Sequence, residues 1–110
     1  MLWQKTRMQA RTLRLIQERF TERNDAAPLE TDAELAQRLA SDDLEAAARL
    51  YDRYASNVQG MVRRLLGPDL ELDDVVQDVF VTAISSIHKL RQPAFLKSWL
   101  LGIAVGKARG

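Results

Sequence analysis

The stretch that decides the fold, residues 72–87, reads LDDVVQDVFVTAISSI. Apolar side chains recur in it at steps of three and four residues, which is the spacing of one face of an α-helix. Acidic residues occupy its first turn, where they complement the positive end of the helix dipole, and Asp69 or a neighbour is the expected N-cap. The predicted buried face consists of Leu72, Val75, Val76, Val79, Phe80, Ala83, Ile84 and Ile87.

A longer amphipathic helix is predicted upstream, with apolar residues from Leu44 to Leu65. Its apolar residues follow the same steps over about six turns. We expect it to start at Ser41 or Asp42, with Glu45 closing a capping box. It should end at the Gly-Pro pair at 67–68, because glycine suits a left-handed cap and proline cannot continue the helix.

Two shorter helices flank this pair. The first should begin at Thr31 or Asp32, where Glu34 completes a capping box with Thr31. The last should run over residues 93–103 and begin at Pro93, because a proline at the first helical position lacks only an N–H that would have no partner there.

The composition agrees with a helical fold. The 110 residues include five glycines, three prolines and no cysteine. Few helix breakers favour helices, and without cysteine no disulfide or thiolate zinc site can form. No apolar run approaches the ~20 residues that span a bilayer, and no signal-peptide core opens this sequence. We therefore expect a soluble, cytoplasmic, all-α domain, a compact bundle of three to four helices.

Charge is unevenly distributed, although the net charge is only +1. Residues 1–30 form a basic extension and linker ahead of a helical domain at 31–110. Within that domain, residues 69–78 are acidic and residues 88–110 are basic. Such blocks indicate partners of opposite charge. Three roles stay open for the extension: a disordered tail, an extra helix that covers the domain, or a contact for DNA or a regulator.

Three carboxylates gather at the start of this helix: Asp74 and Asp78 lie one turn apart with Gln77 beside them, and Asp73 precedes Asp74. Carboxylates accept bidentate hydrogen bonds from arginine, so this helix face suits a basic protein partner. Oxygen ligands also suit magnesium, although no second acidic cluster supplies further ligands. A solvated helix start is the plain alternative, and the residues alone leave all three readings open.

Cations and a polar amide follow in the loop and in the last helix. Basic side chains neutralise phosphates, and loops commonly carry contacts on a rigid scaffold. We expect the basic and acidic surfaces to be held apart by one helical core. The predicted nucleic-acid contacts are Lys89, Arg91, Gln92, Lys97, Lys107 and Arg109.

The aromatic residues of this segment and its histidine have plainer interpretations. Phe95 and Trp99 lie one turn apart on the apolar stripe, so we expect both in the core rather than stacked on bases. His88 is the only histidine and has no nucleophile beside it in a catalytic pattern. We therefore predict no catalytic residue, no metal, no cofactor and no enzymatic activity.

Three sequence blocks together resemble region 2 of the extracytoplasmic-function (ECF) class of bacterial sigma factors. Residues 73–80, DDVVQDVF, are similar to its acidic signature, and residues 95–104, FLKSWLLGIA, to its aromatic block. LYDRYA at 50–55 and VRRLLG at 62–67 are similar to its first long helix. The order and spacing of the blocks are kept over residues 33–109.

The resemblance implies a domain that binds RNA polymerase core and melts promoter DNA. Asp74, Gln77 and Asp78, with Asp73 beside them, would dock on the clamp helices of the polymerase β′ subunit. The loop at 89–93 would capture a flipped base of the minus-10 element, on the non-template strand. The three cations of the last helix would lie along the DNA backbone. An anti-sigma factor is a further partner that the resemblance suggests.

Two features depart from the family pattern. Many members carry Arg-Asn where this chain has Val105-Gly106, so we expect its promoter preference to differ. The helix-turn-helix domain that reads the minus-35 element is absent from this chain, which we expect to be one part of a longer protein. The residues also leave open a helical adaptor with an acidic docking helix, and a metal-dependent enzyme that acts on phosphates.

Overall fold

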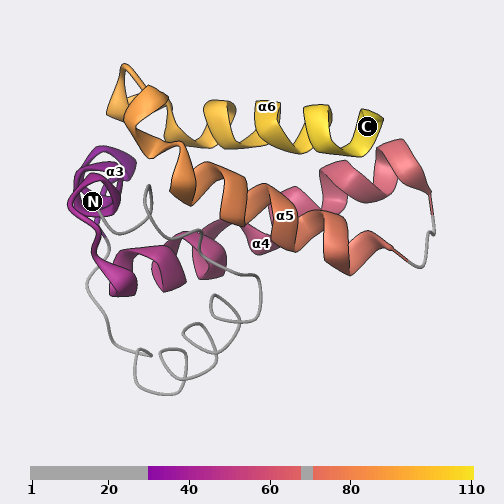
Figure 1. Cartoon of the computed structure of the whole chain (residues 1–110), viewed down its shortest axis with the longest axis horizontal. Coiled ribbons are helices and arrows are strands. Elements are labelled where there is room, and N and C mark those ends of the chain that lie inside the picture. The colour runs from indigo at the N-terminus through magenta and orange to yellow at the C-terminus, as the bar shows by residue number, and fades with distance from the viewer. Residues whose placement is uncertain (1–29, 68–70) are drawn as a thin grey trace.

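The computed structural model of the chain describes residues 30–67 and 71–110 (Figure 1). The predicted extension, Glu30 excepted, and the predicted Asp69 cap lie outside these residues. The described part contains four α-helices, two 3₁₀-helices and no strand, which confirms the all-α prediction. None of its helices is both long and apolar enough to cross a membrane. The elements are α3 (Asp32–Ala40), α4 (Leu44–Leu66), α5 (Leu72–Ser85), η1 (Ile87–Lys89), η2 (Pro93–Phe95) and α6 (Leu96–Arg109).

The predicted capping box starts α3. The Thr31 hydroxyl accepts a hydrogen bond from the Glu34 N–H at 3.1 Å, and the Glu34 carboxylate accepts one from the Thr31 N–H at 2.8 Å. These hydrogen bonds to Thr31 lower the pKa of Glu34. Two otherwise unpaired N–H groups of the helix start are satisfied in this way, so the prediction is confirmed.

The start of α4 differs from the prediction. Asp43 is the N-cap, and its carboxylate accepts hydrogen bonds from the N–H groups of Glu45 at 2.9 Å and Ala46 at 3.4 Å. The predicted start at Ser41 or Asp42 is wrong because the chain turns there: Asp42 has a φ of 61°, a left-handed conformation that aspartate tolerates better than most residues. Gly67 ends α4 with a φ of 75°, as its residue type predicts.

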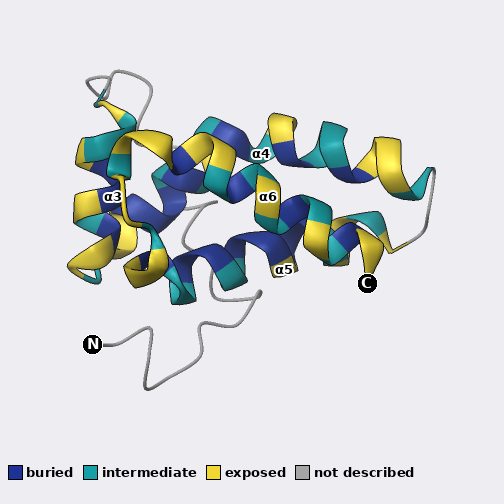
Figure 2. Ribbon diagram, turned by 90° about the horizontal axis from the view of Figure 1, so that it is seen from above, coloured by how far each residue is buried: buried dark blue, intermediate teal, exposed yellow. Residues whose placement is uncertain are grey.

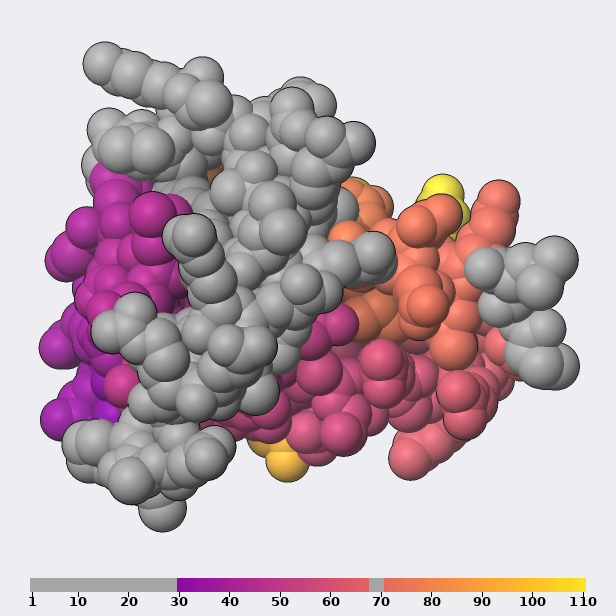
Figure 3. Space-filling view, turned by 90° about the horizontal axis from the view of Figure 1, so that it is seen from below, coloured from indigo at the N-terminus to yellow at the C-terminus, as the bar shows by residue number. Residues whose placement is uncertain are grey.

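The three longer helices pack against one another, and α3 closes one end of the bundle (Figure 1). Leu50 of α4, Phe80 of α5 and Leu100 of α6 are fully buried. Figure 2 shows buried residues along the inner side of each helix. Burying such a side chain contributes about 1.5–3 kcal/mol, so this core sets the orientation of each helix and of its outer face. From the side opposite α6, α4 and α5 lie side by side (Figure 3).

A polar network joins the start of α3 to α4. The Arg53 guanidinium donates to the Asp32 carboxylate at 2.9 Å and to the Glu30 carbonyl at 2.7 Å. The Tyr54 hydroxyl donates to the other oxygen of Asp32. Burial, together with this hydrogen bond to Asp32, raises the pKa of Tyr54 to about 12. The network therefore holds α3 on α4 with Tyr54 in its neutral form.

We expect Tyr54→Phe to lower the free energy of unfolding at neutral pH by about 1.5–3 kcal/mol, the usual effect of losing a hydrogen bond to a charged group. The gap from the wild type should narrow as the pH rises from 10 to about 12. Because folding raises the pKa of Tyr54, its hydrogen bond stabilises the folded state fully below the pKa of the unfolded chain. This stabilisation is lost as the pH rises through the pKa of the folded chain.

Urea unfolding of both chains at neutral pH and at steps above pH 10 measures this gap. A gap that stays constant with pH would contradict the neutral hydrogen bond to Asp32.

Candidate functional site

An acidic surface, defined by Asp73, Asp74 and Asp78, lies on the outer side of α5. All three residues are exposed, while Val79 and Phe80 of the same helix are buried. The carboxylates thus face solvent because the apolar side of α5 is held in the core. In residues 30–67 and 71–110, no group of three or more histidine, aspartate or glutamate side chains is arranged to hold a metal ion. Carboxylates arranged in this way can accept hydrogen bonds from an arginine or lysine of another protein.

Gln77 lies on the same helix but differs from the acidic surface. Its residue is only 9% exposed, and it is the one buried polar residue of the described part. The sequence prediction set Gln77 beside Asp74 and Asp78 as a partner contact. The fold instead turns most of this side chain inward, so only a small part of it is accessible beside the carboxylates.

The loop between α5 and α6 is open to solvent and firmly anchored. Its buried anchor is Ile87, and the N–H of Leu90 donates to the Ile87 carbonyl at 3.0 Å. Lys89, Arg91 and Gln92 are exposed, as predicted. A loop anchored in this way, with exposed cations and an amide, can offer donors to phosphates and to base edges.

Phe95 does not lie in the core. It is 57% exposed, whereas Trp99 is half-buried and packs against the core. The predicted burial of Phe95 is wrong because this residue ends the 3₁₀-helix η2, whose tighter winding takes its side chain off the α6 stripe. The buried stripe of α6 begins instead at Leu96 and continues to Leu100. An exposed ring therefore stands next to the basic loop.

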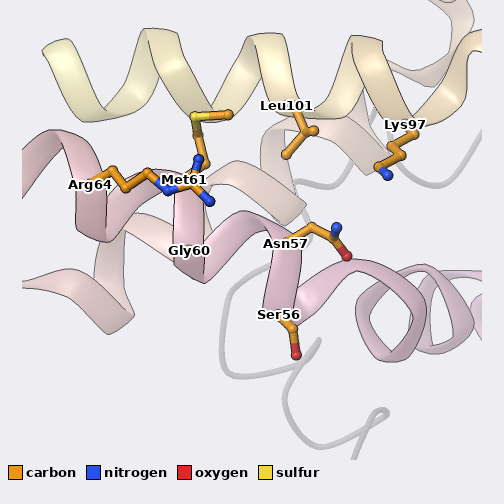
Figure 4. A pocket seen from close by; sticks show the side chains of 7 residues that line it. All are labelled: Ser56, Asn57, Gly60, Met61, Arg64, Lys97 and Leu101. Atoms are coloured by element: carbon orange, nitrogen blue, oxygen red, sulfur yellow. The ribbon is translucent and has the colours of Figure 1, made fainter.

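A groove of about 350 Å³ runs between α4 and α6 (Figure 4). Arg64 and Lys97 lie at opposite ends of it, and Met61 and Leu101 line its apolar part. Lys97 was predicted as a nucleic-acid contact, but Arg64 was not. In the sequence, Arg64 is an ordinary cation near the C-terminus of a helix. The groove exists only because α6 packs beside α4. The groove offers two cations and an apolar wall to a charged, partly apolar ligand.

The acidic and basic surfaces meet at one point. Lys107 Nζ, near the end of α6, lies 3.2 Å from Asp78 Oδ2 on α5. The expected separation of the two charges by the core is therefore wrong at this contact, since α5 and α6 are direct neighbours. Arg109, the last residue of α6, is exposed as predicted.

Comparison with known proteins identifies relatives of this chain. The family model for Sigma-70 region 2 matches residues 50–109, which include α5, the loop and α6. The chain is 34% identical over 79 residues to the ECF RNA polymerase sigma-E factor of Haemophilus influenzae, covering 72% of this chain and 41% of that protein. No solved structure matches the chain.

Two further relatives show similar coverage. The ECF RNA polymerase sigma-E factor of Escherichia coli K12 is 33% identical over 79 residues, or 72% of this chain and 41% of that protein. The RNA polymerase sigma factor NccH of Alcaligenes xylosoxydans xylosoxydans is 30% identical over 78 residues, or 71% and 42%. The chain therefore spans about two fifths of the length of these relatives.

Proposed function

Since this chain belongs to the Sigma-70 region 2 family, and is the corresponding region of an ECF sigma factor, we propose that it binds RNA polymerase core and recognises and melts the minus-10 promoter element. The observation that carries this proposal is that the matched residues, 50–109, contain both the exposed acidic surface of α5 and the exposed basic loop. The domain acts by binding alone, in the bacterial cytoplasm, and catalyses no reaction of its own.

Polymerase docking is the role we propose for the acidic surface. Its carboxylates project from a helix whose other side is buried in the core, so this face of α5 points to solvent before a partner arrives. The clamp helices of the polymerase β′ subunit are the proposed partner, through basic side chains that pair with Asp74 and Asp78. Gln77 would contribute only through its small exposed part. An anti-sigma factor that covered this surface would block docking.

Capture of an unpaired base is the role we propose for the basic loop. Extruding a base costs a few kcal/mol, which stacking and hydrogen bonds can offset. Lys89, Arg91 and Gln92 supply donors and positive charge for the base edge and its phosphate. The exposed ring of Phe95, the last residue of η2, is available for stacking.

The non-template strand is proposed to continue from the loop towards the groove between α4 and α6. Lys97 lies in the first turn of α6, close to the loop in sequence, and Arg64 extends the positive charge along the groove (Figure 4). Both can pair with backbone phosphates. Val105-Gly106 carries no long polar side chain, so sequence reading in this proposal depends on the loop.

We expect Asp74→Lys to weaken binding to RNA polymerase core by about 2–5 kcal/mol, the range for removing one partner of a charge pair that becomes buried at an interface. Asp74 is exposed and has no ion pair within the described residues, so the fold should persist. Competition binding with labelled polymerase core measures the affinity, and circular dichroism checks the fold.

Glu45→Lys is the control, because it makes the same charge reversal at the N-terminal end of α4, away from the start of α5. It also removes an exposed ion pair with Arg38, so circular dichroism checks its fold as well. Its affinity for polymerase core should stay close to that of the wild type. Equal losses in both variants would show that net charge, rather than the acidic surface, determines docking.

We expect Phe95→Ala to weaken binding to a single-stranded minus-10 oligonucleotide by about 1–3 kcal/mol, the effect of losing one stacked base. Because Phe95 is exposed, the free energy of unfolding should change by less than about 0.5 kcal/mol. Fluorescence anisotropy measures the affinity for the oligonucleotide, and urea unfolding measures the free energy of unfolding.

Leu44→Ala is the control for this change, since Leu44 is a 45% exposed apolar side chain at the start of α4. It should leave DNA binding unaltered. Arg91→Ala adds a second comparison: a loss confined to the minus-10 sequence indicates base contact, and an equal loss on every sequence indicates phosphate contact. Unchanged DNA affinity in both Phe95→Ala and Arg91→Ala would contradict the proposed DNA surface.

A further inference from the structure

The ion pair between Asp78 and Lys107 joins the two proposed binding surfaces. We propose that this pair couples them: each partner, on binding, releases the side chain that the other partner needs. This coupling rests on the proposed function, which assigns Asp78 to the polymerase and Lys107 to DNA. In the free chain, Asp78 and Lys107 pair with each other. In the bound chain, Asp78 pairs with polymerase and Lys107 with DNA.

The pair lies where partners can reach it. The side chains of Asp78 and Lys107 are 54% and 37% exposed, and their charged atoms are 3.2 Å apart. A depression of about 310 Å³ opens beside them, lined by Thr82 and Ser85 among others. An incoming side chain can therefore approach either member of the pair without disturbing the core.

Competition follows from the chemistry of the two groups. An arginine of the partner would bind the Asp78 carboxylate in a bidentate manner, through both oxygens. One of these oxygens, Oδ2, is the one nearest to Lys107 in the free chain. The arginine and the lysine ammonium repel each other at this oxygen, so arginine binding weakens the ion pair and makes Lys107 more available to a phosphate. A phosphate that captures Lys107 first leaves Asp78 free for the arginine.

The two effects are linked by thermodynamics. If polymerase raises the affinity for DNA through this pair, DNA raises the affinity for polymerase by the same factor. An exposed ion pair supports a factor of about two to five, and less at high salt. The coupling therefore favours the state in which both partners are bound over either partial complex.

The first test needs no polymerase. In the 110-residue chain at low salt, Asp78→Asn should raise the affinity for a single-stranded minus-10 oligonucleotide by about two- to five-fold, because Lys107 is released. Asp74→Asn is the matched control: it removes the same charge one turn away, where no ion pair is formed within the described residues. Its gain should be clearly smaller.

A background variant isolates the pair. In a Lys107→Gln chain, Asp78→Asn should give no more gain than Asp74→Asn. A gain from Asp78→Asn that equals the gain from Asp74→Asn in the wild-type background would overturn the coupling while leaving the DNA surface intact. A wild-type chain that does not bind the oligonucleotide at all would instead overturn the proposed DNA surface, and the coupling with it.

The reciprocal test uses polymerase core without DNA. Lys107→Gln should raise the affinity for core by about two- to five-fold, because Asp78 no longer has an internal partner. Arg109→Gln removes the same charge two residues on and should give little gain. Equal gains would overturn the coupling. The docking assignment fails separately, if Asp74→Lys leaves the affinity for core unchanged.

Discussion

Mutual burial of the apolar faces of α4, α5 and α6 is the constraint on which the rest of the structure depends. Leu50, Phe80 and Leu100 are fully buried where these helices meet. None of the three helices can therefore rotate about its axis without exposing large apolar side chains. The outward direction of the carboxylates of α5 is a consequence of this packing. So is the path of the chain between α5 and α6, which leaves the loop exposed.

Periodicity in the sequence was sufficient to predict the helices of the described part, and residue type predicted two of their ends. The capping box at Thr31 and the glycine end of α4 have local causes, and local rules describe them well. The start of α4 was predicted too early because Asp42 adopts a left-handed turn, which three adjacent polar residues do not reveal. Phe95 was assigned to the core because a helical period was extended across η2, where the winding changes.

The candidate site was predictable only where it is local in sequence. The three acids of α5 and the cations of the loop occur as compact blocks, so charge alone identified them. Arg64 and the contact between Asp78 and Lys107 depend on which helices become neighbours, and a one-dimensional pattern carries no such information. The separation of charge that the blocks indicated is accordingly incomplete, and the contact that interrupts it is what can link the two surfaces.

Amide chemical-shift mapping on the 110-residue chain tests most directly whether one helical core presents two distinct binding surfaces. A single-stranded minus-10 oligonucleotide should perturb the loop at 88–95 and the groove near Arg64, and a β′ clamp-helix fragment should perturb the first two turns of α5. Only the contact between Asp78 and Lys107 should respond to both. Overlapping footprints over the whole of α5 and α6, for either ligand, would contradict the account.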